Sequence, residues 1–269
     1  MQISILACGW LGLPLARTLL ERGHHVKGST TREEKLATLE ESGIDPYLIR
    51  FSPEINENYQ PDFFDSEVLI VNIPPKRNEE VTETYSRQIA SLLRTVEKSP
   101  VKKVLFVSST SVYPNVNRPV RESDASEDVR ASGRALLTTE RMVQEQPGIQ
   151  TTVLRFCGLF GPDRNPGRFL AGKTLDSSGS VPVNMIHLDD CIAIIVKILE
   201  QNGWGETFNA CADEHPAKED FYGEAARQLD FDPPQFAATE ANAYKVVDST
   251  KLKEMLSYDF KYPDPRKAL

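Results

Sequence analysis

The chain has 269 residues, of which 40% are hydrophobic and 26% are charged, so it is long enough to bury the core of a sizeable globular protein. Its 39 acidic and 31 basic residues give a formal net charge of −8, so the basic surface of a nucleic-acid-binding protein is not expected. The longest apolar run, Cys191 to Leu199, is too short to span a bilayer and contains Lys197, so no membrane partner is expected either.

The four cysteines, Cys8, Cys157, Cys191 and Cys211, are scattered along the chain and form no Cys-x-x-Cys pair. Most of them lie in apolar runs, which indicates small buried residues in a reducing compartment rather than disulfides. The four histidines also lack the spacing of metal ligands, so no metal site is predicted. Because no secretory signal is visible, the sequence predicts a cytoplasmic protein.

The N-terminal stretch predicts a strand, a glycine turn and a helix that runs to about Glu21. The N–H groups at the start of such a helix favour the pyrophosphate of a dinucleotide. In the motif G-x-G-x-x-G, Gly9 is the second glycine and lets the backbone approach the pyrophosphate, and Gly12 is the third and lets the helix pack on the strand. Ala7 stands in place of the first glycine. The alternative is a turn with small residues for packing. The predicted contacts come from Ala7, Gly9, Trp10, Leu11 and Gly12.

A second strand, His25 to Ser29, is followed by Thr30, Thr31 and Arg32. Proteins that bind NAD usually have an acidic residue at this strand end, whereas an arginine accommodates the 2′-phosphate of NADP. No acidic residue stands here, and an arginine can hold a phosphate bidentately. We therefore predict NADP(H) in preference to NAD(H). A compatible alternative is that Thr31 caps a helix over residues 32–41 together with Glu34.

The following elements alternate in a way that predicts a parallel sheet with helices on both faces. Phe51, at the end of the third strand, is expected beside the adenine, and Asn72, Ile73 and Pro74 end the fourth strand and point toward the cofactor. Ser108 at the end of the fifth strand is expected to contact the cofactor as well. The predicted segments are strands at 47–51, 67–75 and 103–109 and a helix at 79–97.

The second half of the chain continues the alternation, with a glycine- and proline-rich loop at 158–179 that is expected to line a substrate cleft. Arg164 and Arg168 in this loop are candidates for binding a substrate phosphate, and a solvated loop is the alternative. His187 beside Asp189 invites an acid–base interpretation, but helix capping and backbone bonding are favoured. The predicted segments are helices at 132–146, 191–201, 218–229 and 249–256 and strands at 151–156 and 207–210.

Four further motifs accompany the N-terminal turn, namely Val107–Pro114, Leu154–Pro162, Met185–Asp190 and Asp248–Leu256. With these motifs the chain resembles the extended short-chain dehydrogenase/reductases of the NAD(P)-dependent epimerase/dehydratase family. The resemblance implies an α/β fold, a Rossmann-type doubly wound parallel sheet with a small C-terminal substrate lobe. We expect the Rossmann domain at 1–157 and the lobe at 158–269, with some segments of the latter returning to the sheet.

Members of this family use a Tyr-x-x-x-Lys pair, in which the lysine lowers the tyrosine pKa and the tyrosine exchanges a proton with the substrate. Aligned on the surrounding motif, Ser132 stands where the tyrosine belongs and Leu136 where the lysine belongs. Ser109 matches the family's catalytic serine. Tyr113 is a candidate substitute acid, although that position more often serves packing. The chain thus looks like an atypical member with a non-standard active site.

The resemblance implies an NAD(P)-binding oxidoreductase or epimerase/dehydratase-like protein that acts on a small molecule, such as a nucleotide-linked sugar or a carbonyl compound. The alternative is a catalytically inactive NADP-binding regulator or redox sensor, which the missing tyrosine and lysine favour and the retained Ser109 disfavours. Related proteins often dimerise, so a homodimer is also an open expectation.

Overall fold

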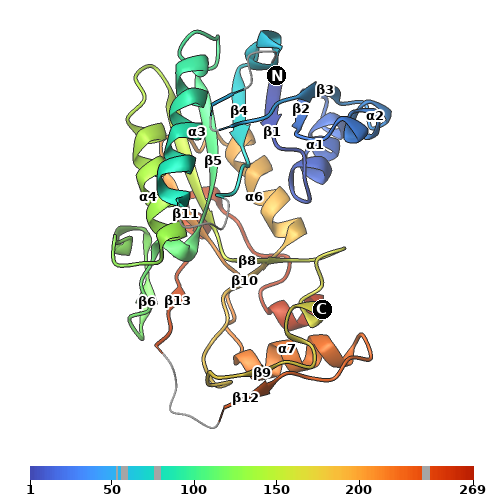
Figure 1. The fold of residues 1–269 in the computed structure, drawn as a ribbon, viewed down its shortest axis with the longest axis vertical. Coiled ribbons are helices and arrows are strands. Elements are labelled where there is room, and N and C mark those ends of the chain that lie inside the picture. Colours follow the sequence, from blue (N-terminus) through green and yellow to red (C-terminus); the bar gives the residue numbers. More distant parts are fainter. Residues whose placement is uncertain (53, 56–59, 76–79, 238–242) are drawn as a thin grey trace. The chain divides into compact units, whose positions relative to one another are not determined.

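A computed structural model describes residues 1–52, 54–55, 60–75, 80–237 and 243–269 (Figure 1). The described chain divides into two compact units, which are treated separately below. Unit 1 comprises residues 1–112, 126–155 and 196–207, and unit 2 comprises residues 113–125, 156–195 and 208–269. Among the described residues no helix is both long and apolar enough to cross a membrane.

The central feature is a seven-stranded parallel sheet in the order β11-β7-β5-β4-β1-β2-β3. The order reverses beside β1, as in a doubly wound sheet, and the strands are apolar because both faces are covered. The predicted fold class is therefore confirmed. The strands are β1 (Gln2–Leu6), β2 (His25–Thr30), β3 (Asp45–Leu48), β4 (Val68–Val71), β5 (Lys103–Ser109), β7 (Gln150–Phe156) and β11 (Thr207–Ala210).

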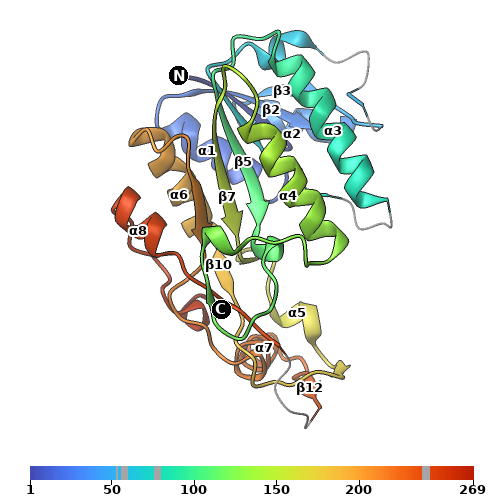
Figure 2. The same cartoon turned by 90° about the vertical axis from the view of Figure 1, so that its left-hand side faces the viewer.

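Helices flank both faces of the sheet in unit 1 (Figure 2). Two of them, α3 and α4, pack against each other on one face, and α1 lies on the other. Each is amphipathic, and its apolar stripe supplies the residues that cover the sheet. The helical elements of unit 1 are α1 (Gly12–Glu21), η1 (Glu33–Lys35), α2 (Leu36–Glu41), η2 (Pro61–Phe64), α3 (Val81–Val96), η3 (Thr110–Val112) and α4 (Ala131–Gln144).

Unit 2 is built from short elements around a small core that includes Phe160, Val183, Met185 and Phe221. Its elements, of which α6 runs on into unit 1, are β6 (Pro119–Val120), η4 (Glu122–Asp124), β8 (Gly158–Phe160), α5 (Gly167–Leu170), β9 (Thr174–Leu175), β10 (Met185–His187), α6 (Leu188–Glu200), α7 (Lys218–Arg227), β12 (Gln235–Phe236), β13 (Val246–Val247), α8 (Thr250–Leu256) and η5 (Pro265–Ala268).

Several predicted boundaries shift. The helix expected from Arg32 begins as η1, and its N-cap side chain makes no capping bond. The N-cap residue is Arg32 rather than Thr31, so the predicted cap by Thr31 is wrong; the Thr30 hydroxyl accepts the Arg32 N–H at 3.2 Å. The third strand starts and ends earlier than expected, and the loop 158–179 contains β8, α5 and β9. Glu79, the predicted start of α3, lies outside the described residues.

A close approach of α1 to β1 depends on the absence of a side chain at Gly12. A Cβ at this position would press against the Ala7 carbonyl oxygen and come within 3.4 Å of the Asn72 amide nitrogen. At Gly9, three residues earlier, a Cβ would meet nothing within 4 Å. The two glycines of the turn are thus under different constraints: packing requires Gly12, whereas packing leaves Gly9 free.

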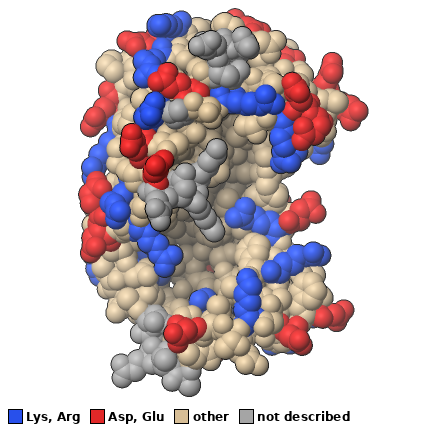
Figure 3. Space-filling view, in the orientation of Figure 1, with Lys and Arg blue, Asp and Glu red and all other residues tan. Residues whose placement is uncertain are grey.

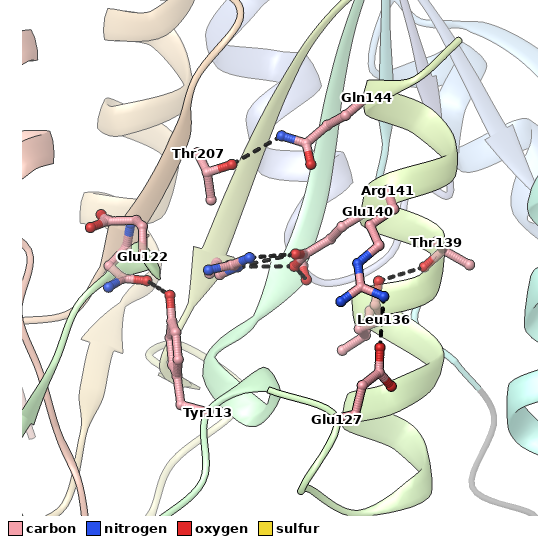
Figure 4. A network of polar contacts seen from close by, with 12 residues as sticks. Tyr113, Glu122, Glu127, Leu136, Thr139, Glu140, Arg141, Gln144 and Thr207 are labelled. Atoms are coloured by element: carbon pink, nitrogen blue, oxygen red, sulfur yellow. Dashed lines mark hydrogen bonds and ion pairs between the residues drawn. The ribbon is translucent and has the colours of Figure 1, made fainter. Parts of the chain in front are cut away.

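A buried ion pair joins β5, α4 and β7. The Glu140 side chain is 1% exposed and the Arg155 side chain 6% exposed, and Arg155 Nη2 lies 2.6 Å from Glu140 Oε2. Arg155 Nε also donates to both carboxylate oxygens, at 3.1 and 3.2 Å, and the Ser108 hydroxyl donates to Oε1. Figure 4 shows the Glu140 carboxylate reaching this group from α4. Because a charge in the interior is stable only when it is paired, this network fixes the three elements together.

We expect Gly12→Ala to lower the free energy of unfolding by about 1–3 kcal/mol, because the new methyl group forces α1 away from Ala7. Gly9→Ala is the matched control and should change it by less than about 0.5 kcal/mol. Urea denaturation of the three proteins measures both changes. Equal losses in the two variants would contradict this account of the turn.

Arg155→Met should cost about 3–5 kcal/mol of folding free energy, because it leaves the Glu140 carboxylate buried without its partner. Arg141→Met is the control: Arg141 lies on the same helix in an exposed pair with Glu127, and such pairs contribute at most about 1 kcal/mol. The double variant Glu140→Gln, Arg155→Met should lose less than the sum of its two single changes. Additive losses in this cycle would show that the two side chains do not act as a pair.

Candidate functional site

The carboxyl ends of β1, β2 and β4 meet around Ala7. This residue has φ of 76°, a left-handed conformation that favours glycine, so alanine occupies the first glycine position without changing the turn. Its N–H donates to the Ser29 hydroxyl at 2.9 Å, and its carbonyl accepts from the Asn72 side-chain amide at 3.2 Å. Neighbouring strands therefore hold the turn from both sides.

The start of α1 offers backbone donors to an anion. The residue before the helix, Leu11, makes no side-chain capping bond, and no acidic residue lies in the first turn. The positive end of the helix dipole and the uncapped N–H groups favour a phosphate at this place. Because a side chain at Gly9 would occupy open space, the backbone of the predicted turn can be approached closely there.

One predicted cofactor residue after β4, Ile73, is held by a tyrosine that the sequence did not single out. The Tyr85 hydroxyl, from α3, donates to the Ile73 carbonyl at 2.6 Å, and the Tyr85 side chain is buried. Burial raises the pKa of this hydroxyl, which therefore stays protonated as a donor. Pro74 is exposed, whereas Phe51 is half-buried and forms an isolated bridge with Ile55.

The end of β2 has two arginines, of which sequence reasoning found one. Arg32 is exposed, and Arg50 is also exposed with its Nε bonded to the Thr31 carbonyl at 2.9 Å. Arg50 follows β3, which is paired with β2, so strand pairing rather than sequence distance brings it to Thr31. The only signal for Arg50 was its position at the end of the third predicted strand.

The two serines that end β5 have different surroundings. Ser108 is buried and its hydroxyl is bound to Glu140, and its contact with the cofactor stays a prediction. Ser109 is half-buried, and its oxygen accepts the Ser111 N–H at 3.2 Å. Among the described residues nothing accepts the Ser109 hydroxyl proton, which leaves a donor at the carboxyl end of β5.

The first turn of α4 lies directly against the η3 turn that follows Ser109. Close contact with the Ser111 carbonyl leaves no room for a side chain at Gly133. Ser132 is half-buried in this turn, and within the described part of the chain its hydroxyl has no hydrogen-bond partner. Leu136, one turn later, is 4% exposed and packs as an aliphatic residue. Figure 4 shows this stretch of α4 near Thr139 and Glu140.

In unit 2, Tyr113 does not suit the role of a substitute acid. Its side chain is 2% exposed, and its hydroxyl donates to Asn209 Oδ1 at 2.6 Å (Figure 4). The Asn209 amide in turn donates to the Asp248 carbonyl at 3.1 Å. A general acid must reach the reacting atom, whereas this hydroxyl is committed to the interior. These contacts favour a positioning role for Tyr113, and its catalytic role stays a prediction.

The predicted substrate arginines are both exposed. Arg164 donates from Nε to the Leu159 carbonyl at 2.9 Å, which orders its stem beside β8. Arg168 lies over the Phe231 ring at 5.9 Å. These contacts leave both cations at the surface of unit 2. A substrate-binding role for them stays a prediction.

His187 is a structural residue in this arrangement. It is 7% exposed, lies between the Phe160 and Tyr262 rings, and accepts the Asp189 N–H at Nδ1 at 3.2 Å. Burial lowers the pKa of His187, so the neutral ring is favoured. The Asp189 carboxylate pairs with Lys261 rather than serving a proton relay.

The adjacent Asp190 is fully buried and binds the segment after α8. It accepts the Tyr258 hydroxyl at 2.6 Å and the Lys261 N–H at 2.7 Å through Oδ1, and the Tyr262 N–H at 3.2 Å through Oδ2. Burial and the bond to Asp190 raise the pKa of Tyr258, so its hydroxyl remains a donor. The predicted helix-cap role of this aspartate pair is replaced by a tertiary anchor.

Both signs of charge are present on the described surface, and a described cavity lies at the amino edge of the sheet. On the face shown in Figure 3, Lys and Arg side chains and Asp and Glu side chains are both present among the coloured residues. A cavity of about 450 Å³ is lined by α3 residues and by segments that precede β4 and β5, so it lies at the amino edge. In the described ranges no group of His, Cys, Asp or Glu side chains is arranged to hold a metal ion.

Comparison with known proteins identifies the relatives of the chain. The family model described as NAD dependent epimerase/dehydratase family matches residues 7–211. The protein YeeZ of Escherichia coli strain K12 is 36% identical over 267 residues, which cover 98% of this chain and 97% of that protein. The match to the family model begins at Ala7, in the turn described above, and ends just after β11.

Solved structures share the fold over nearly the whole chain. A UDP-glucuronic acid 4-epimerase from Bacillus cereus, in complex with NAD, has a TM-score of 0.79 at 19% identity, covering 100% of this chain and 95% of that chain. A UDP-glucose 4-epimerase from Thermotoga maritima, with UDP-glucose, has a TM-score of 0.78 at 19% identity, covering 100% and 96%. The sheet order, the glycine turn and these matches agree, and the chain belongs to the NAD dependent epimerase/dehydratase family.

Proposed function

We propose that the chain binds a nicotinamide dinucleotide at the Ala7–Gly12 turn and uses it in oxidoreductase- or epimerase-type chemistry on a small molecule. The observation that carries the proposal is the uncapped start of α1 beside an approachable Gly9, in a member of an NAD-dependent family. Nicotinamide cofactors supply hydride exchange when bound. Relatives named as nucleotide-sugar 4-epimerases support a nucleotide-linked sugar as one substrate class.

The roles of this chain's residues follow from their hydrogen bonds. Ser109 keeps a hydroxyl proton to donate to a substrate oxygen, and its own oxygen is oriented by the Ser111 N–H. Ser132 offers a second uncommitted hydroxyl on the neighbouring helix turn. Leu136 can neither donate a proton nor lower a neighbour's pKa. Proton exchange therefore falls to these serines with water, rather than to a tyrosine–lysine pair.

We also propose NADP(H) as the preferred cofactor, on the basis of the two arginines at the end of β2. A 2′-phosphate at this strand end would contact the guanidinium groups of Arg32 and Arg50. The stretch from Thr30 to Arg32 contains no acidic residue that would repel it. Arg50 strengthens this proposal because its bond to the Thr31 carbonyl orients it toward the same turn. Each arginine can form charge-assisted bonds to a phosphate.

A reducing, cytoplasmic location is proposed from the cysteines. All four are free thiols and buried. Burial raises the pKa of Cys8 to about 12 and that of Cys191 and Cys211 well above the usual range, so these thiols are poorly reactive. Such residues serve packing, and they need no oxidising environment.

Titration with NADH and NADPH, followed by nicotinamide fluorescence, tests the cofactor proposal. The unmodified chain should bind, and Gly9→Ala should bind at least about 10-fold more weakly, because its methyl group separates the backbone donors from the pyrophosphate. Folding should be unchanged in this variant. An unmodified chain that binds neither cofactor would overturn the proposal.

The Ser109→Ala variant separates enzyme from regulator in the same assay. It should keep cofactor binding while losing turnover with nucleotide sugars or carbonyl compounds. Cofactor binding by the unmodified chain with no turnover of any compound tested would instead identify a regulator or redox sensor, which family membership does not favour.

Replacing Arg32 or Arg50 by alanine should weaken NADPH binding about 10- to 100-fold and leave NADH binding nearly unchanged, since only NADPH has the 2′-phosphate. Arg22→Ala serves as the control, because Arg22 is engaged by Glu200 away from this turn. Fluorescence titration gives both affinities. NADH affinities that fall in parallel would show that the arginines act on the fold or on the shared part of the cofactor.

A further inference from the structure

Lys245 occupies an unusual place in unit 2, immediately before β13. Side chains alternate along an extended strand, so Lys245 shares a face with Val247, which is 2% exposed. Lys245 itself is half-buried. An ammonium group is thus directed to the same side as a core residue, whereas lysines are normally found at the surface.

The backbone that presents Lys245 is held on both edges. On one edge, Tyr244 exchanges two hydrogen bonds of 2.8 Å with Asn117, and the Asp248 N–H donates to the Val120 carbonyl at 2.9 Å. On the other edge, Asn184 donates to the Lys245 carbonyl at 2.9 Å and accepts the Val247 N–H at 2.8 Å. The lysine is therefore carried by a rigid strap, as binding residues usually are.

The ammonium group has an incomplete set of partners. Lys245 Nζ donates to the Tyr113 backbone carbonyl at 2.6 Å. Within the described ranges this is its one hydrogen bond, and no carboxylate pairs with it, although an ammonium can donate three bonds. Burial is the main influence on the Lys245 pKa and lowers it, whereas an interaction with Cys157 raises it to a lesser extent. Burying a cation without a counter-ion is unfavourable, and an arriving anion would relieve that cost.

The position of Lys245 suits contact with a substrate. The ammonium group is fixed beside Tyr113, which follows the η3 turn, and near Cys157, which immediately follows β7. Tyr113, Cys157 and Lys245 all belong to unit 2, so the surroundings of the ammonium group are formed within one unit.

We propose that Lys245 anchors an anion subsite in unit 2 that binds a phosphate or carboxylate group of the substrate. This inference rests on the proposed function in that it assumes a small-molecule substrate of the same chain. It narrows the substrate class to molecules that carry a negatively charged group. Asn184 is the positioning residue of the subsite, because its side-chain amide binds the Lys245 carbonyl and the Val247 N–H.

Calorimetric titration of the full chain with inorganic pyrophosphate, and separately with glucuronate, tests the subsite. Saturating NADPH is present so that the glycine turn does not bind the probe. At least one probe should bind, and the stronger one identifies phosphate or carboxylate. Lys245→Met should weaken that binding about 10- to 100-fold, and Lys245→Arg should retain most of it. Lys253→Met, which removes an exposed pair with Asp213, is the matched control and should bind as the unmodified chain does.

Two readouts keep the outcome decisive. Equal probe affinities for the unmodified chain and Lys245→Met, or no binding of either probe, would overturn the subsite. If Lys245→Met fails to fold, the unmodified chain is acetylated at its amines with and without the probe, and peptide mass spectrometry measures whether the probe protects Lys245. Protection without any NADPH binding would remove the cofactor proposal and leave the subsite standing. NADPH binding without protection would do the reverse.

Discussion

The Glu140 carboxylate is the contact on which the arrangement of the candidate site depends. It lies in the interior on α4 and is neutralised by Arg155 of β7 while it accepts the hydroxyl of Ser108 of β5. An unpaired charge at this depth is costly, so the three elements have one mutual arrangement at which all partners are satisfied. Ser109 follows Ser108, and Ser132 precedes Glu140 by two turns of the same helix. The buried Glu140–Arg155 pair therefore determines where the uncommitted hydroxyls of Ser109 and Ser132 lie.

The pattern of strands and helices in unit 1 could be predicted from the sequence because it depends on local periodicity and on glycine and proline positions. The conformation of the turn at Ala7 was harder to predict, because alanine rarely adopts a positive φ. Its hydrogen bonds to Ser29 and Asn72 hold Ala7 in that conformation. The predicted Thr31 cap was wrong because the helical segment starts one residue later than expected, with Arg32 as its N-cap residue.

The residues that sequence reasoning missed share one property: their partners are distant in the chain. Arg50 reaches Thr31 through strand pairing, and Tyr85 reaches Ile73 from a helix. Lys245 meets the Tyr113 carbonyl 132 positions away. Motifs record residues at fixed spacing, so they find the turn and the serines but not such contacts. The same limit applies to Tyr113: its motif position suggested chemistry, and the distant Asn209 that accepts its hydroxyl could not be found from the motif.

The Asp190 anchor also determines how the end of the chain behaves. Its two oxygens receive one hydroxyl and two backbone N–H groups from residues 258–262, so a helix in the middle of the sequence and the segment after α8 depend on each other. If that segment detached, the fully buried Asp190 carboxylate would lose three donors at once. If α6 shifted, the Tyr258 hydroxyl and the two N–H groups would lose the carboxylate that accepts them. Local fraying of this segment is thus suppressed. The amide hydrogens of residues 258–262 are expected to exchange with solvent as slowly as those in the core of unit 2, and more slowly than those in its surface loops.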